Sequence, residues 1–162
     1  MPRNTWWKGE RGEWYVVVQG LLFLVVALGP QEAFGLTRWG PPFGSATFLP
    51  GLALMGAGGL LGLAGLLNLG RNLTPLPHPK DDAELVETGA YSFVRHPIYS
   101  GLIMAALGWA LSVASPLTLL YAVSLFLFFD IKSRREEQWL SAKFPRYAEY
   151  QRRVRKLIPF IY

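Results

Sequence analysis

The chain has 162 residues, enough for a single domain, and 51% of them are hydrophobic while 17% are charged. It contains no cysteine, which excludes disulfides and thiolate metal sites, and its two histidines are too few for the usual three- or four-ligand metal centre. The net charge of +5 lies beside apolar runs, so anionic lipid headgroups explain it better than nucleic acid does. These features predict an all-α, polytopic membrane protein with about four transmembrane helices, no metal and no nucleic-acid partner.

The first apolar run extends from residue 14 to residue 31 without a charge. Trp6 and Trp7 precede it, and tryptophan is typical of a membrane interface. The alternative is a signal peptide, because Ala27-Leu28-Gly29 faintly resembles a cleavage site. The length of the run favours a retained first span at about 14–30.

The second apolar run predicts a span at about 47–69. Phe48 to Leu69 gives 22 residues, which at 1.5 Å per residue is sufficient to cross a hydrocarbon core of ~30 Å. Gly58 and Gly62 are separated by three residues, a spacing that lets helix backbones approach closely in lipid. We interpret these glycines as helix-packing residues; close approach of a cofactor to Gly56-Ala57-Gly58 is the weaker alternative.

A polar, turn-rich segment follows at residues 71–97, with prolines and an acidic cluster but no clear helical period. Loops of this length in a compact domain are often functional. His78 lies between two prolines, and we expect it to be solvated.

The next 33 residues, 97–129, are uncharged and too long for one span. The break at Ser112-Val-Ala-Ser-Pro116 predicts a helical hairpin with spans at about 98–113 and 117–131. The second helix is expected to continue past the membrane, because residues 130–143 contain no glycine or proline. Glu136 and Glu137 then lie roughly 10 Å beyond the last apolar turn.

The tail is basic and aromatic. Its aromatic and apolar residues recur at spacings of three and four between Pro145 and Pro159, which predicts an amphipathic interfacial helix and places the C-terminal helices at 132–158. Lysine and arginine are concentrated before the first span, in the 71–97 loop and in the tail. The positive-inside rule therefore predicts a cell-membrane protein whose termini and 71–97 loop are cytoplasmic.

Arg95, His96 and Tyr99 are thus expected on the same membrane face as Glu136 and Glu137. Pro97 fits the first turn of a helix and favours an extended conformation at His96. Carboxylates and tyrosines near lipid suit a cationic cofactor, and arginine suits an acidic substrate. Considered alone, these residues also fit a simple juxtamembrane anchor, and they leave the reaction unspecified.

Several motifs together resemble the isoprenylcysteine carboxyl methyltransferase family and the related phospholipid N-methyltransferases. The resemblance covers about residues 48–160. It rests on Leu69-Gly70-Arg71-Asn72, Gly89-Ala90-Tyr91, Arg95-His96-Pro97-Ile98-Tyr99-Ser100-Gly101, Glu136-Glu137-Gln138-Trp139-Leu140 and the tail residues Phe144, Tyr147, Tyr150, Val154, Ile158 and Pro159.

The resemblance implies S-adenosylmethionine bound without a Rossmann fold, in a pocket that opens sideways to the bilayer. It implies cofactor contacts for Tyr91, Arg95, His96, Pro97, Tyr99, Gly101, Glu136 and Glu137, and catalytic roles for Arg95, His96, Glu137 and Arg152. Arg95, Arg152 or Arg153 would orient an acidic acceptor. A carboxylate or thiolate acceptor needs no general base, whereas an amine needs one, with His96 or a glutamate as the candidate.

The chain departs from the family at two places. Phe144-Pro145 stands where family members commonly have Phe-Gly, and the N-terminal region is shorter than in the eukaryotic prenylcysteine enzymes. A small or lipidic acceptor is therefore at least as good an expectation as prenylcysteine. The alternatives are an NADPH-dependent membrane reductase of similar architecture, for which no glycine fingerprint is present, and a non-catalytic membrane protein that binds lipid or a partner.

Overall fold

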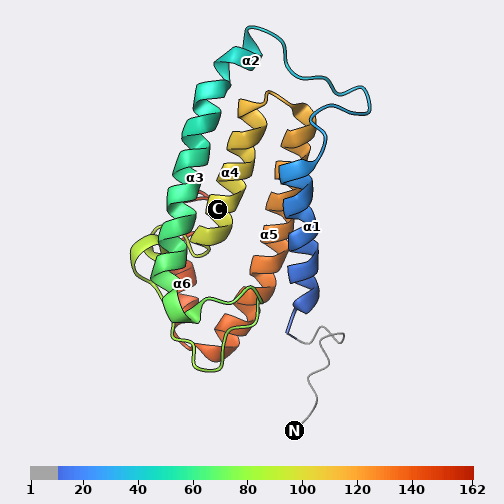
Figure 1. The fold of residues 1–162 in the computed structure, drawn as a ribbon. Helices are drawn as coiled ribbons and strands as arrows, with labels where there is room; N and C mark the ends of the chain where they lie inside the picture. Colours follow the sequence, from blue (N-terminus) through green and yellow to red (C-terminus); the bar gives the residue numbers. More distant parts are fainter. Residues whose placement is uncertain (1–10) are drawn as a thin grey trace.

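Four long helices stand side by side in the computed structural model, which describes residues 11–162 (Figure 1). They are α1 (Glu13–Leu28), α3 (Phe48–Leu69), α4 (Pro97–Ser112) and α5 (Pro116–Lys143). The short elements are α2 (Phe43–Ala46), η2 (Gly70–Asn72), η3 (Gly89–Ser92) and α6 (Tyr147–Arg153). Within the described part there is no strand, only two isolated bridges, so the all-α prediction is confirmed. The predicted interfacial tryptophans Trp6 and Trp7 lie outside the described residues.

The α4–α5 hairpin is defined by proline at the start of each helix. Pro97 and Pro116 occupy first-turn positions, where the missing backbone N–H costs no hydrogen bond. Ser115 caps α5, since its hydroxyl oxygen accepts a hydrogen bond from the backbone N–H of Thr118 at 3.1 Å. The break between the two helices therefore falls where the sequence predicted it.

Helices α3 and α4 approach each other through glycines. A Cβ added to Gly101 would lie 2.5 Å from the carbonyl oxygen of Gly58 and 2.6 Å from the backbone nitrogen of Gly62. Gly51 and Gly108 meet in the same way further along the two helices. The interpretation of Gly58 and Gly62 as packing residues is confirmed, because both lie against Gly101 in this contact, and a Cβ added to Gly58 would lie only 2.6 Å from the Gly101 carbonyl oxygen.

Helix α1 packs against α5, and two pairs of aromatic rings contribute to the contact. The Tyr15 and Phe128 rings lie 6.2 Å apart, and the Phe23 and Phe129 rings lie 6.3 Å apart. Phe129 is fully buried in a core that also contains residues of α4. The first predicted span is thus an integral part of the bundle.

The outer surface of the bundle is apolar. Leu60 and Leu67 on α3 are each 72% exposed, which suits lipid and not the buried core of a soluble protein. In the described part, two helical segments are long and apolar enough to cross a membrane, Phe43–Asn72 and Pro116–Lys143. The apolar part of the second ends at Phe129, and residues 130–143 form a charged extension of α5.

The predicted interfacial tail helix is wrong in its extent and in its partner. Helix α6 has only seven residues; Val154 is extended, and the chain then continues in bends and a turn at residues 159–161. Tyr147 and Tyr150 are buried against other parts of the protein, among them Leu85 and Leu140. The helix ends early because the following carbonyl groups accept hydrogen bonds from the 71–97 loop: those of residues 155 and 156 bond the backbone N–H groups of residues 95 and 96, at 2.8 and 3.2 Å.

Candidate functional site

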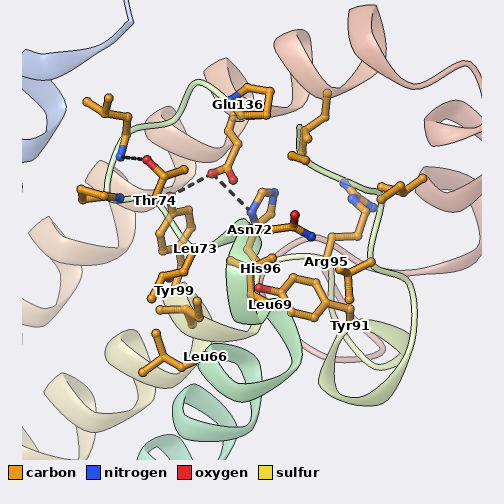
Figure 2. A pocket seen from close by; sticks show the side chains of 18 of the residues that line it. Leu66, Leu69, Asn72, Leu73, Thr74, Tyr91, Arg95, His96, Tyr99 and Glu136 are labelled. Atoms are coloured by element: carbon orange, nitrogen blue, oxygen red, sulfur yellow. Dashed lines mark hydrogen bonds and ion pairs between the residues drawn. The ribbon is translucent and has the colours of Figure 1, made fainter. Parts of the chain in front are cut away.

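A cavity of about 320 Å³ lies at the end of the bundle where the 71–97 loop, the α5 extension and α6 meet (Figure 2). Its polar lining includes Arg95, His96, Lys132 and Glu136. Its apolar lining includes residues from three helices and the loop: Leu66, Leu69, Leu73, Ile98, Leu102 and Leu140. The cavity therefore joins a charged region to an apolar region that lies between the helices.

Arg95, His96 and Glu137 form a buried ionic network beside this cavity. The Arg95 Nε donates to Glu137 Oε1 at 2.7 Å, and His96 Nε2 lies 3.1 Å from the same oxygen. The second carboxylate oxygen accepts a hydrogen bond from the Gln151 side-chain amide at 3.1 Å. The side chains of Arg95 and Glu137 are each 11% exposed. The prediction that the loop and the α5 extension meet is confirmed by these contacts.

Glu137 is held in its ionised form. Burial by itself would raise the pKa of Glu137, but the hydrogen bonds from His96 and Arg95 outweigh it and lower that pKa from 4.5 to about 2. Glu137 is outside the cavity lining, so its carboxylate faces Arg95 and His96 instead of the cavity. Glu137 is therefore placed to position the side chains of Arg95 and His96, which line the cavity.

Glu136 presents its carboxylate to the cavity. Tyr99 donates its hydroxyl to Glu136 Oε2 at 2.8 Å, and His96 Nδ1 lies 3.7 Å from that oxygen (Figure 2). The Tyr99 ring is stacked between His96 and Phe129, with centroids 5.4 and 4.5 Å away. Neighbouring helical residues point about 100° apart, which is why the two adjacent glutamates reach different partners.

Three buried tyrosines form an aromatic wall. The Tyr150 hydroxyl donates to the backbone carbonyl of Tyr91 at 2.6 Å, and the Tyr147 and Tyr150 rings contact edge to face at 5.8 Å. Burial raises the pKa of all three hydroxyls well above the ordinary value, so they are neutral hydrogen-bonding groups. The wall offers flat apolar surfaces with polar edges.

The proline-rich segment at residues 73–86 covers the cavity. Asn72 exchanges two hydrogen bonds with the backbone of Glu84, at 3.0 and 3.2 Å. Lys143, at the end of α5, donates to the backbone carbonyls of Lys80 and Asp81. His78 packs edge-on against Trp139 with ring centroids 5.3 Å apart, so it contacts protein where we expected solvent.

The structure brings together only some of the expected site residues. Tyr91, Arg95, His96, Tyr99 and Glu136 line the cavity, with Glu137 directly behind Arg95 and His96. Pro97 is buried at the start of α4 beside Gly65, and Gly101 lies in the α3–α4 contact, so neither lines the cavity. Arg152 is exposed on α6 and also lies outside the lining, and its catalytic role stays a prediction.

Lys132 and Gln19 are among the lining residues that sequence reasoning missed. A lysine directly after an apolar run is ordinarily interpreted as a snorkelling anchor, and a glutamine within an apolar helix gives no positional signal. Lys132 is 1% exposed, and burial lowers its pKa to about 8, although the charge of Glu136 opposes this shift. The one available signal was its position four residues before Glu136, on the same helical face.

Residues 46–146 match the protein-family model described as phospholipid methyltransferase. The chain is 31% identical over 115 residues to protein-S-isoprenylcysteine O-methyltransferase B of Arabidopsis thaliana, an overlap of 68% of this chain and 58% of the relative. It is also 31% identical over 150 residues to the cobalt-zinc-cadmium resistance protein CzcN of Cupriavidus metallidurans, covering 91% of this chain and 62% of the relative.

A solved structure of the eukaryotic intramembrane Ras methyltransferase ICMT has a similar fold. Its TM-score is 0.64 at 24% sequence identity, and the match covers 99% of this chain and 55% of that chain. This likeness concerns the fold. The present chain spans roughly three fifths of the length of the plant and bacterial relatives named above.

Proposed function

This chain belongs to the phospholipid methyltransferase family, and from that premise we propose that it transfers the methyl group of S-adenosylmethionine to a lipidic or small hydrophobic acceptor. The acceptor atom is a carboxylate oxygen, a thiolate sulfur or an amine nitrogen. The observation that carries the proposal is the continuity of one cavity from the charged group of Arg95, His96 and Glu136 to the apolar residues between the helices. A hydrophilic methyl donor and an apolar acceptor need such a two-part site.

The reaction makes modest chemical demands on the protein. An electron pair of the acceptor forms a bond to the methyl carbon while the carbon–sulfur bond breaks, and the sulfonium becomes a neutral thioether. Catalysis is therefore mainly alignment, exclusion of water and placement of charge. The covering segment at 73–86 and the apolar lining suit the exclusion of water.

The residues present fit such a donor. The Glu136 carboxylate faces the cavity and has the chemistry to accept hydrogen bonds from an ammonium or from ribose hydroxyls. The neutral rings of Tyr91 and Tyr147 suit a planar base. For an amine acceptor, His96 and Glu136 are the candidate bases, whereas a carboxylate or thiolate needs none.

We also propose that all four long helices cross the cell membrane, with the cavity at its cytoplasmic face. Supporting this orientation, the 16 lysines and arginines are distributed with three before α1, one between α1 and α3, three between α3 and α4, none between α4 and α5, and nine from residue 130 onwards. The positive-inside rule places the charged segments in the cytoplasm.

The direct test is calorimetric titration of the detergent-solubilised protein with S-adenosylhomocysteine. We expect micromolar binding, and we expect Glu136→Gln to weaken it by about 10- to 100-fold, the usual effect of losing a charge-assisted hydrogen bond. Glu149→Gln, at an exposed position on α6, is the matched control and should bind like the wild type. Absence of binding to the wild type would remove the proposal, and binding of NADPH in its place would favour the reductase.

The acceptor is best identified by labelling. Membrane extracts incubated with the protein and methyl-labelled S-adenosylmethionine should yield one dominant labelled lipidic or hydrophobic product. Mild base then releases labelled methanol from a methyl ester, whereas an N- or S-methylated product keeps its label.

A further inference from the structure

Lys132 is a buried cation that lines the cavity. It lies one helical turn before Glu136 on α5, and its side chain is among the largest that are fully buried. Its Nζ donates to the side-chain oxygen of Gln19 on α1 at 2.5 Å and to the backbone carbonyl of Pro75 at 3.0 Å. The ammonium is thus fixed at the junction of α1, α5 and the covering segment.

The positive charge of Lys132 forms no ion pair within the described residues, although the negative charge of Glu136, one helical turn away, acts on it. Both hydrogen-bond acceptors are uncharged, and no carboxylate of residues 11–162 forms an ion pair with its Nζ within 4.0 Å. Its Nζ also lies over the Tyr99 ring, 5.2 Å from the ring centroid. An ammonium has three N–H donors, so one is available for a further acceptor.

The other strongly buried cations of the described part contrast with Lys132. Lys156 is paired with Asp130, and Arg95 is paired with Glu137. A buried charge that is not paired is costly, which is also why burial lowers the pKa of Lys132. This cost is offset when an anion binds beside it.

We propose that Lys132 is an anion subsite of this cavity and binds the carboxylate of a bound ligand. The inference rests on the proposed function and deepens it. Two ligands supply the same chemistry: the amino-acid part of the methyl donor carries a carboxylate, and so does an acidic amphiphile that acts as acceptor. In the second case Lys132 selects anionic acceptors and repels amines, because like charges brought together in a low-dielectric cavity are unfavourable.

The position of Lys132 suits a carboxylate that belongs to the acceptor. It is one turn, or ~6 Å along the helix, closer to the apolar part of α5 than Glu136. Gln19, from within the apolar helix α1, is its partner, and Leu66 and Leu102 line the same cavity. A carboxylate attached to an apolar chain therefore meets Lys132 at the border between the apolar and polar regions.

The test compares wild type with Lys132→Met, which keeps the length of the side chain and removes its charge. Each protein is titrated in detergent with S-adenosylhomocysteine and with 5′-methylthioadenosine, which lacks the amino-acid carboxylate. The protein saturated with S-adenosylhomocysteine is then titrated with decanoate and with its neutral amide.

If the donor supplies the carboxylate, Lys132→Met weakens S-adenosylhomocysteine binding by about 10- to 100-fold and leaves 5′-methylthioadenosine binding unchanged. If the acceptor supplies it, decanoate binds the wild type more tightly than the amide, and the variant loses this preference. Either result supports the subsite, and Lys132→Arg should restore most of the lost affinity. A variant that matches the wild type for all four ligands overturns it.

Lys143→Met is the matched control. Lys143 also donates to backbone carbonyls of the covering segment, but it lies outside the cavity lining. An equal loss of affinity in both variants would show that the effect comes from loosening the segment, and this too overturns the subsite. A wild type that fails to bind S-adenosylhomocysteine removes the proposed function instead, while the decanoate comparison, made in that case with the ligand-free protein, still decides the role of Lys132.

Discussion

Replacing Glu137 with glutamine is expected to destabilise the protein by about 3 kcal/mol and to weaken S-adenosylhomocysteine binding at least tenfold. The substitution leaves Arg95 and His96 buried without their anion, and breaking one side of a buried pair typically costs this much. Binding suffers because both side chains line the cavity and depend on Glu137 for their orientation. The measurements are the thermal unfolding midpoint in detergent and calorimetric titration.

The matched control is Glu87→Gln. Glu87 pairs with Arg153, whose side chain is 55% exposed, so this substitution should cost less than about 1 kcal/mol. Equal stability of the two variants would show that the Arg95–Glu137 pair contributes no more than a surface contact does.

The same carboxylate predicts how stability depends on pH. Because the pKa of Glu137 is lowered from 4.5 to about 2 on folding, its ionised form favours the folded state. This contribution is fully present above pH 4.5 and is lost as the pH falls towards 2. The thermal unfolding midpoint of the wild type should therefore fall markedly as the pH decreases from 4.5 to 2. The midpoint of Glu137→Gln should fall less over the same interval. Parallel curves for the two proteins would contradict this assignment.

Replacing Gly101 with valine is expected to separate α3 from α4 and to abolish accumulation of folded protein. Its Cβ would lie 2.5 Å from the Gly58 carbonyl oxygen and 2.6 Å from the Gly62 nitrogen, and backbone atoms cannot move aside as a flexible side chain can. Overpacking of this severity costs about 3 kcal/mol or more. The measurement is the yield of monodisperse protein and its thermal midpoint.

Gly59→Val is the control for this prediction. Nothing lies within 4 Å of a Cβ added at Gly59, so the same side chain on the same pair of helices should be tolerated. If Gly101→Val instead folded normally and lost only S-adenosylhomocysteine binding, the cofactor contact that the family resemblance implies for Gly101 would be supported.

The helices could be predicted because the signals for them are local. Uncharged runs of sufficient length, Pro97 and Pro116 at helix starts, and the absence of glycine and proline after Phe129 are all evident in the sequence. The contact between Arg95 and Glu137 could also be predicted from the sequence. The α4–α5 hairpin connects the two segments that carry these residues and brings them to the same end of the bundle.

The remaining features depend on tertiary contacts that leave no local signal. The spacing of Tyr147, Tyr150 and Val154 is the same whether the helical face meets lipid or protein, which is why the tail was predicted as interfacial. Gly101 lies within a motif of polar residues, yet its neighbours in space are glycines of α3. The position of Lys132 in the cavity depends on Gln19, 113 residues earlier.

The segment at residues 151–157 makes the order of biosynthesis relevant to the cavity. Residues 151–157 provide carbonyl groups for the Arg95 side chain, for the backbone N–H groups of residues 95 and 96, and for the Ser100 hydroxyl. These residues follow the four long helices of the described part in the sequence and are therefore synthesised after them. A nascent chain thus contains these helices before the Arg95 region has its partners, and the proposed methyl-donor site is complete only once residues 151–157 have been made.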